Sequence, residues 1–421
     1  MYKKIIFDNG LRLITIPNKS TKAVTCLVLV GTGSKYETKE INGISHFLEH
    51  MFGKGTKKRP TALEISETID GIGGKWNFFI SKEYTGFWAK VEESRLNLAL
   101  DWVSDILLNL KLEPQEIKRE KGVIIEEINM YLDTPRRYIW DLWEELLYGE
   151  QPAGWHTLGK KENILRFQRK HFLDYLKNHY SALNSIVCIA GGLNQEGILG
   201  SVKRYFKNIE RKPPQQKTEV VENQVKPQLL LHFKKTDQAH LCLGVRAYSL
   251  IHPQRYAQEI LATILGGNMS SRIFISVREK KGLTYDILTF SELYTDSGYV
   301  VTKAGVPNKN VSEVIELILK EYKRIKQKKI SQKELKKAKE YLKGNLTLDL
   351  ESSDEQASFY ASQELLTGKI LTPEEISAKI DEVTANDIQK VAQDIFKPEK
   401  LNLAIIGPFK DGSKFEKMLR L

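Results

Sequence analysis

The alternation of hydrophobic and polar residues predicts a β-hairpin at the start of the chain, followed by a buried strand. Residues 5–7 and 11–16 are apolar runs on either side of an Asn-Gly turn, which is a strong hairpin signal. Residues 23–31 form a nearly continuous apolar run, as expected for a strand that is buried on at least one face. Residues 92–110 change to the helical period. The first half therefore predicts an α+β arrangement.

The second half of the chain repeats this plan weakly. Its predicted strands and helices are, in chain order, 229–233, 240–245, 256–266, 286–290, 298–304, 311–326 and 332–348. Residues 211–227, between the halves, are polar, contain prolines and lack a sustained apolar period, which is typical of a linker. We therefore predict two structurally similar α+β domains, 1–210 and 228–421, each an antiparallel-rich sheet packed with helices.

The composition is that of a soluble globular protein, with 41% hydrophobic and 28% charged residues in a chain of 421. No apolar run reaches the roughly 18–20 residues that a membrane span needs. The first residues show neither the long apolar core nor the cleavage site of a signal peptide. The cysteines Cys26, Cys188 and Cys242 are scattered in apolar runs, as expected for small buried side chains in a reducing compartment. We expect a cytoplasmic protein.

A formal net charge of +11 makes a nucleic-acid partner worth considering. However, the lysines occur in mixed segments such as 323–329 and 333–337, where the pattern is typical of solvated helix faces. No array of stacking aromatic residues or nucleic-acid motif accompanies them. We therefore expect no nucleic-acid partner.

The main candidate for chemistry is a short helix that carries His46, Glu49 and His50. These residues stand at positions i, i+3 and i+4, so on an α-helix they project from one face. Two imidazoles one turn apart can bind one Zn²⁺ ion, and the adjacent carboxylate can accept a proton from water at the metal. The order His-x-x-Glu-His inverts the commoner zinc helix and is a motif in its own right. The alternative is that two of the eight histidines lie together by chance on an amphipathic helix.

A second, acidic helix offers candidates for a third ligand. Residues 114–128 keep the helical period, and Glu120 and Glu127 are two turns apart, so they share one face. Isoleucines lie close to that face, which predicts that at least one of the two carboxylates points inward and needs a metal or a cation as partner. Without the histidine motif, exposed glutamates would be the default interpretation. With it, a third zinc ligand is the missing part of the site.

The histidine helix and the Gly-Lys-Gly-Thr segment after it resemble the zinc helix of the inverted zinc metallopeptidases (inverzincins), the family of pitrilysin, insulysin and the mitochondrial processing peptidase. The chain resembles a short, two-domain, bacterial-type member over essentially its whole length. That family has its third ligand in a downstream Arg-Glu run. The resemblance implies Glu127 as the third ligand, Glu120 as the residue behind a ligand and Glu49 as the general base. Glu126 is the alternative ligand if the register differs by one.

Two further stretches match that family. Segment 73–78 resembles a Gly-Gly strand beside the active site, which implies that Asn77 and the strand edge hold the substrate backbone. Phe78 stands where the family commonly has a small residue and is expected to narrow a substrate pocket. Arg278 and Tyr285 have the spacing of an arginine and a tyrosine that polarise the scissile region from the second domain. From the residues alone, a basic helix end and a buried tyrosine would be the simpler interpretation.

The resemblance implies a zinc-dependent endopeptidase that hydrolyses unfolded peptides or oligopeptides inside a clam-shell chamber, with Zn²⁺ bound by His46, His50 and Glu127. Residues 228–421 would support the substrate. Family members of this length work as pairs of chains, so a homodimer, or a heterodimer with a related chain, is expected. Arg278 and Tyr285 would act in cis or in trans. The alternative is a catalytically silent or partner-dependent subunit of a processing-peptidase-like complex, although such subunits usually lose motif residues.

Overall fold

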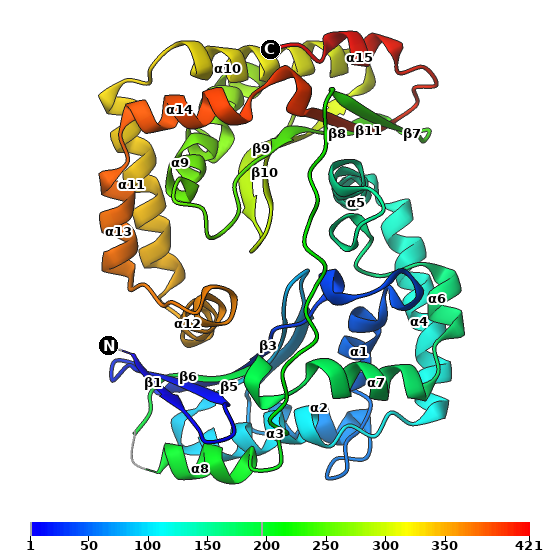
Figure 1. Cartoon of the computed structure of the whole chain (residues 1–421), viewed down its shortest axis with the longest axis vertical. Coiled ribbons are helices and arrows are strands. Elements are labelled where there is room, and N and C mark those ends of the chain that lie inside the picture. The colour runs from blue at the N-terminus through cyan, green and yellow to red at the C-terminus, as the bar shows by residue number, and fades with distance from the viewer. Residues whose placement is uncertain (1, 195–196) are drawn as a thin grey trace. The chain divides into compact units, whose positions relative to one another are not determined.

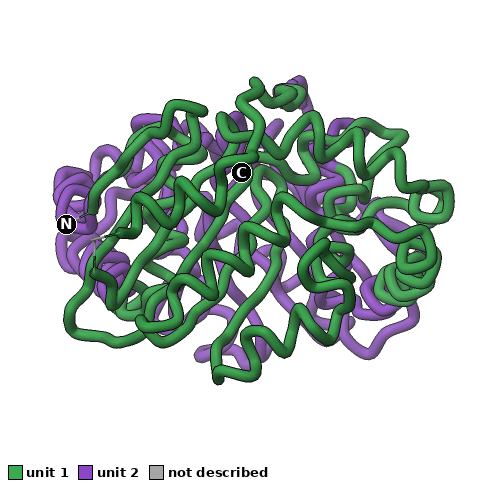
Figure 2. Tube along the Cα trace, turned by 90° about the horizontal axis from the view of Figure 1, so that it is seen from below, with its two compact units in different colours: residues 1–129, 155–218, 348–370 green, residues 130–154, 219–347, 371–421 purple. Residues whose placement is uncertain are grey.

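The computed structural model describes residues 2–194 and 197–421, which fold into two compact units (Figure 2). Unit 1 consists of residues 1–129, 155–218 and 348–370, and unit 2 of residues 130–154, 219–347 and 371–421. Each unit contains one β-sheet that is packed with helices (Figure 1). The predicted α+β class with two similar domains is confirmed.

The sheet of unit 1 has the strand order β1-β2-β6-β3-β5-β4. The strands are β1 Lys3–Ile6, β2 Arg12–Pro17, β3 Ala23–Val30, β4 Lys75–Ile80, β5 Thr85–Glu92 and β6 Ser185–Gly191. Only the β2–β6 pair is parallel. The predicted hairpin joins β1 to β2, and Gly10 in its turn has a φ of +85°, which favours glycine. Strand β4 lies at one edge and pairs only with β5.

The sheet of unit 2 has the order β7-β11-β8-β10-β9. Its strands are β7 Gln228–Phe233, β8 Gln238–Arg246, β9 Asp286–Leu293, β10 Gly298–Pro307 and β11 Leu401–Gly407. The β7–β11 pair is parallel and the others are antiparallel. This pattern matches β2-β6-β3-β5-β4 strand for strand, so the two sheets share one topology, and β9 takes the edge place that β4 has in unit 1.

The helices follow the strands in the same order in both halves. In the first half they are α1 Ile44–Phe52, α2 Ala62–Asp70, α3 Leu96–Leu108, α4 Pro114–Asp133, α5 Pro135–Tyr148, α6 Lys161–Arg166, α7 Arg169–His179 and α8 Ile198–Tyr205. In the second half they are α9 Arg255–Gly266, α10 Val311–Gln327, α11 Gln332–Asp349, α12 Ser353–Thr367, α13 Pro373–Glu382, α14 Ala385–Ile395 and α15 Ser413–Met418. Single turns of helix join them: η1 Ser34–Tyr36, η2 Lys39–Ile41, η3 Glu93–Arg95, η4 Pro152–Gly154, η5 Ala182–Asn184, η6 Phe274–Glu279, η7 Asn308–Asn310 and η8 Pro398–Lys400.

Each sheet is covered on one face by a helix from the other half of the chain. In unit 1, α12 packs on β3 and β6 (Figure 1). Its Ala357 and Ala361 belong to the same cluster of buried side chains as Leu27 and Leu29. In unit 2, α5 packs on β7, β8 and β11, and its Trp143 lies in the same cluster of buried side chains as β8 and β11 residues. Because side chains alternate along a strand, the opposite face of the unit 2 sheet carries a separate core against α9, α10 and α14.

The compact units therefore differ from the continuous ranges 1–210 and 228–421 that the sequence predicts. Residues 130–154 and 348–370 are exchanged, because each sheet takes its apolar cover from a distant helix. The predicted linker, 211–227, contains neither helix nor strand; its first eight residues group with unit 1 and the rest with unit 2. Among the described residues, no helix has both the length and the apolar character of a membrane span. The cytoplasmic location stays a prediction.

Candidate metal centre

The histidine motif lies on α1, whose N-terminus is fixed by a buried carboxylate. Glu37 accepts hydrogen bonds from the backbone N–H groups of Gly43 and Ser45 at 2.8 and 2.9 Å and from the Asn42 amide at 3.0 Å. The Ser45 hydroxyl also lies 2.8 Å from the buried Tyr175 hydroxyl. Burial raises the pKa of Glu37 to about 7, although these hydrogen bonds act in the opposite direction. The first turn of the helix is therefore held by groups outside it.

The structure brings His46, His50 and Glu127 together. One carboxylate oxygen of Glu127, on α4, lies 3.4 Å from Nε2 of His46 and 3.2 Å from Nε2 of His50. The two imidazole rings are 4.7 Å apart between centroids and inclined by 70°. Hydrogen bonds from both histidines hold the pKa of Glu127 well below its ordinary value. Two nitrogen atoms and one oxygen atom thus converge on one point.

These donor atoms fit a tetrahedral metal ion. Zinc holds nitrogen and oxygen ligands at about 2.0–2.1 Å, so two ligand atoms of a tetrahedral site lie about 3.3 Å apart. The observed separations of 3.4 and 3.2 Å agree with that spacing. A His₂Glu set is a typical donor set for catalytic zinc, because three protein ligands leave one position open. Among the described residues, His46, His50 and Glu127 form the group of possible ligands that lies close enough to hold one ion.

Glu120 stands behind His50. Its Oε1 lies 2.8 Å from Nδ1 of His50, so the imidazole can present Nε2 to the metal position. The Glu120 carboxylate is buried, which raises its pKa, but the hydrogen bond with His50 and the ion pair with Lys54 outweigh burial and lower it. Burial likewise lowers the pKa of His50, yet Glu120 and Glu127 raise it to about 9. The carboxylates of Glu120 and Glu127 beside His50 therefore favour a positive charge at this position. His46 differs, since its buried Nδ1 has no hydrogen-bond partner among the described residues.

Glu49 lies on α1 directly before His50 and is not one of the converging donors. Burial raises the pKa of Glu49 to about 7; the nearby Glu127 acts in the same direction and His50 in the opposite one. A carboxyl group in this range can accept and release protons near neutral pH. The position and acidity of Glu49 suit a general base, as the resemblance implies.

The two candidate ligands on the acidic helix, Glu126 and Glu127, differ in exposure. Glu126 is exposed and contacts Asn129 through a 3.4 Å hydrogen bond, whereas its neighbour Glu127 faces the histidines. Both Glu120 and Glu127 point toward α1, while the sequence alone required only one of them to point inward. Arg119, which precedes Glu120, is exposed and pairs with Glu116 at 2.6 Å.

Asn77 and Phe78 lie on the edge strand β4 and face opposite ways. Asn77 is exposed. Phe78 is buried, with its ring stacked on Trp102 at a centroid distance of 5.6 Å and 6.2 Å from the ring of Phe52 at the end of α1. Phe78 thus fills the space beneath the end of α1, and this packing gives no support to the expectation that its ring narrows an open substrate pocket.

Arg278 and Tyr285 belong to unit 2 and contact each other. The guanidinium carbon of Arg278 lies 4.7 Å from the Tyr285 ring centroid and 4.8 Å from that of Phe274. Arg278 is in the π-helical turn η6, and Tyr285 precedes β9 with 83% of its surface exposed. The expected pair is therefore assembled, but Tyr285 is not the buried tyrosine that the simpler interpretation supposed.

Two supporting residues escaped the sequence analysis. Glu37 precedes the motif by nine positions and carries no periodic signal, so only the folded chain shows that it caps α1. Lys54 belongs to the Gly-Lys-Gly-Thr segment after the motif, and nothing in the sequence indicates its contact with Glu120. Its Nζ lies 2.7 Å from Oε2 of Glu120.

Known proteins similar to this chain point to a family of peptidases. The model described as "Insulinase (Peptidase family M16)" matches residues 12–161, and "Peptidase M16 inactive domain" matches residues 166–342. The chain is 36% identical to the uncharacterized zinc protease YmxG of Bacillus subtilis, over 97% of this chain and 98% of that protein. It is 34% identical to an uncharacterized zinc protease of Rickettsia felis, over 95% and 96% of the two chains.

Solved structures show the same fold. A protease from Helicobacter pylori superposes with a TM-score of 0.91 at 22% identity, over 97% of this chain and 99% of that one. A protein from Pseudomonas fluorescens described as a peptidase M16 inactive domain superposes with a TM-score of 0.89 at 16% identity, over 97% and 98%. The two family models together span most of the chain, and the resemblance drawn from the motif is confirmed: this chain belongs to the insulinase family of peptidases, family M16.

Proposed function

We propose that this protein is a zinc-dependent endopeptidase that hydrolyses unfolded peptides or oligopeptides. The observation that carries the proposal is the convergence of His46, His50 and Glu127 at the spacing of a tetrahedral ion, with Glu49 beside them. Membership of a peptidase family and relatives named zinc proteases support the same conclusion.

The chain's own residues divide the chemistry among them. A Zn²⁺ ion held by His46, His50 and Glu127 would supply Lewis-acid activation of water and of a peptide carbonyl. Glu49 takes a proton from the attacking water and returns it to the amine as the peptide bond breaks. Glu120 accepts the Nδ1–H of His50 and keeps the imidazole in the tautomer whose Nε2 is free to bind.

The edge strand β4 is the proposed substrate platform. One side of β4 pairs with β5, and no strand of the described part of the chain pairs with the other side, so its backbone groups are available to an extended peptide. A peptide added there is held by main-chain hydrogen bonds, which are largely independent of sequence. The exposed Asn77 would bind the substrate backbone, and Phe78 supports the end of α1 from beneath.

Arg278 and Tyr285 are proposed to stabilise negative charge on the carbonyl oxygen. A cation and a phenol can do so together, and the exposed Tyr285 ring that covers Arg278 is accessible to a ligand. We propose a homodimer, with a heterodimer of related chains as the alternative, and the pair acting on the same or the partner chain. Light scattering coupled to gel filtration would separate a dimer from the 48.3 kDa monomer.

The decisive experiment measures cleavage of an unstructured, quenched-fluorescence peptide by the purified protein. Glu49→Gln should lower kcat by about 10²–10⁴-fold, the usual contribution of a general base, and leave bound zinc unchanged. Removing the metal with a chelator should abolish activity, and adding zinc should restore it. Glu67→Gln, the same substitution at an exposed position of α2, is the matched control and should retain full activity.

The outcomes distinguish an active endopeptidase from a partner-dependent or catalytically silent subunit. Full activity in Glu49→Gln, or after complete metal removal, would overturn the proposed mechanism. An inactive but zinc-loaded wild type that becomes active with a related chain would establish the partner-dependent alternative. An inactive wild type that binds no zinc would point to the silent subunit.

A further inference from the structure

Lys54 is connected to the candidate metal centre through Glu120, although it is not part of the His-x-x-Glu-His motif. Its Nζ lies 2.7 Å from Oε2 of Glu120, whose other oxygen lies 2.8 Å from Nδ1 of His50. The Glu120 side chain is only 3% exposed, and Oε2 accepts no well-aligned hydrogen bond from the described residues. The charge of the Lys54 ammonium is therefore what compensates this oxygen.

The position of Lys54 is set by the rigid segment that follows α1. The backbone N–H of Lys54 donates to Met51 at 3.0 Å, and the next residue, Gly55, accepts from Lys111 at 3.1 Å. Gly55 has a φ of +140°, and a Cβ there would lie 2.5 Å from the carbonyl oxygen of Pro60, so this tight turn requires glycine. The backbone at Lys54 is thus held from both sides.

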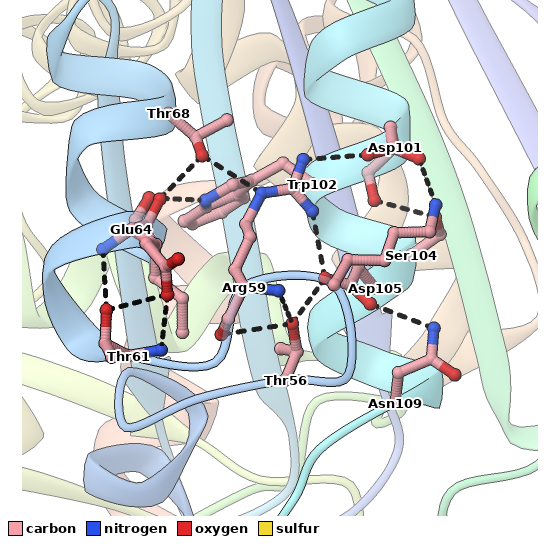
Figure 3. A network of polar contacts seen from close by, with 12 residues as sticks. Thr56, Arg59, Thr61, Glu64, Thr68, Asp101, Trp102, Ser104, Asp105 and Asn109 are labelled. Atoms are coloured by element: carbon pink, nitrogen blue, oxygen red, sulfur yellow. Dashed lines mark hydrogen bonds and ion pairs between the residues drawn. The ribbon is translucent and has the colours of Figure 1, made fainter.

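A polar network anchors the same segment to α3 (Figure 3). Arg59 donates to Asp105 at 2.9 Å and to Asp101 at 2.7 Å. The buried Asp105 also accepts from the Thr56 hydroxyl and, at 2.9 Å, from the Asn109 amide. Lys58 contacts Asp101 on the outer side. Because these groups fix residues 55–59, the side chain of Lys54 extends from a defined point toward Glu120.

We propose that Lys54 is a positioning residue of the metal centre, which acts through Glu120 to hold His50 in its ligating orientation. The proposal rests on the proposed zinc site and adds a residue to it. The Lys54 ammonium lies 2.7 Å from Oε2 and the His50 imidazole 2.8 Å from Oε1, so the Glu120 carboxylate is held at both oxygens. The ion pair of Lys54 with Oε2 fixes the direction in which Oε1 faces His50, and without it the carboxylate can rotate away from the imidazole.

The experiment measures zinc affinity by competition with a chromogenic chelator, a readout that does not depend on activity. Lys54→Met should weaken zinc binding by about 10–100-fold, the range for residues that orient a ligand. Lys54→Arg, which keeps the charge, should stay within a few-fold of the wild type. The matched control is Lys58→Met, because Lys58 lies in the same segment but pairs with Asp101, and it should bind zinc like the wild type.

A double-mutant cycle tests whether Lys54 acts through Glu120. In a Glu120→Gln background, which has no charge to compensate, Lys54→Met should cause little further loss of zinc affinity. Additive losses, or an unchanged affinity in Lys54→Met, would overturn the proposal. Circular dichroism checks the fold of each variant. Should Lys54→Met unfold, Lys54→Gln takes its place and should lose more zinc affinity than Lys54→Arg; equal affinity in the wild type, Lys54→Gln and Lys54→Arg would overturn the proposal.

The two proposals fail in distinguishable ways. A wild type that binds no zinc removes the metal centre and with it the role of Lys54. A wild type that binds zinc as tightly as Lys54→Met leaves the metal centre intact and excludes Lys54 alone.

Discussion

Helix α1 of unit 1 and helix α9 of unit 2 occupy the same place in the same topology, yet among the described residues the candidate metal centre is on α1. Helix α1 packs against the edge strand β4, and α9 against the equivalent edge strand β9. The buried residues of α9 are mainly apolar, and its buried Gln258 is bound to Ser291 and Tyr248. The fold therefore accepts an inert helix at this position, and the chemistry depends on side chains.

The helices that follow show what else the centre requires. In unit 1, α4 directs Glu120 and Glu127 at α1. In unit 2 the corresponding helix, α11, uses Glu334 to bind Arg272 through two hydrogen bonds of 2.7 Å. A carboxylate on this helix closes an ion pair in unit 2, whereas in unit 1 the helix brings Glu127 to the two histidines of α1. Histidines on α1 alone would thus leave the site incomplete.

The largest expected effect comes from the ligand on α4. Glu127→Gln should weaken zinc binding by more than the roughly 100-fold that loss of a supporting residue causes, because it removes a charged ligand. Glu126→Gln, its exposed neighbour, should leave the affinity unchanged. Metal analysis of both purified variants makes the measurement. Equal zinc content in the two would break the assignment of Glu127.

The arginines after α1 and α9 provide the next comparison. Arg59→Met strips a fully buried Asp105 of its cation and should cost about 3 kcal/mol of unfolding free energy. Arg272→Met leaves a Glu334 side chain that is 25% exposed and can be hydrated, so about 1 kcal/mol is expected. Urea unfolding of both variants tests the order, and a larger loss in Arg272→Met would contradict it.

Much of the centre was predictable because helical spacing fixes directions. The i, i+3, i+4 pattern placed His46, Glu49 and His50 on one face, and the two-turn spacing placed Glu120 with Glu127. Lys54 was not predictable, since it follows the helix, and its direction depends on contacts of Arg59 with Asp105 that join segments far apart in the chain.

The fold shows the same limit at a larger scale. Apolar periodicity predicts that a helix has a buried face, and it located α3, α9 and α10. It carries no information on which sheet that face covers. The packing of α5 on the sheet of unit 2 and of α12 on that of unit 1 depends on tertiary contacts. Because the sequence pattern does not contain these contacts, it predicts continuous domain ranges, whereas the compact units are discontinuous.

The two units also contain desolvated groups that titrate in opposite senses, a buried histidine in unit 1 and a half-buried glutamate in unit 2. In unit 1, burial, aided by Lys212, lowers the pKa of His179 to about 4, and its ring packs on Tyr175 at 4.3 Å between centroids. Between pH 6.5 and 4 the unfolded chain binds a proton that the folded chain does not, so stability falls as the pH drops through this window. At pH 4.5 the loss should reach about 2–3 kcal/mol. His179→Phe should remove it, which urea unfolding at pH 7.5 and 4.5 would show; an unchanged pH dependence would contradict the assignment.

Glu259 on α9 gives the sharpest comparison with Glu49 on α1. Burial raises the pKa of each carboxyl to about 7, with Arg255 opposing the shift at Glu259. The folded chain keeps the Glu259 proton between pH 4.5 and 7 while the unfolded chain releases it, so stability falls as the pH rises through that window. Glu259→Gln should therefore gain about 1–2 kcal/mol over the wild type at pH 8 and nothing at pH 4.5.

Activity then separates the two glutamates. Glu259→Gln should cleave peptide like the wild type, whereas Glu49→Gln should not, because only Glu49 has ligands beside it. Glu316→Gln, at an exposed position of α10, controls for the loss of one charge and should show neither effect. A raised pKa thus marks desolvation on both helices, and the proposal that Glu49 acts as a base rests on the converging donor atoms beside it. A loss of activity in Glu259→Gln as large as that in Glu49→Gln would show that the second copy of the fold takes a direct part in the reaction.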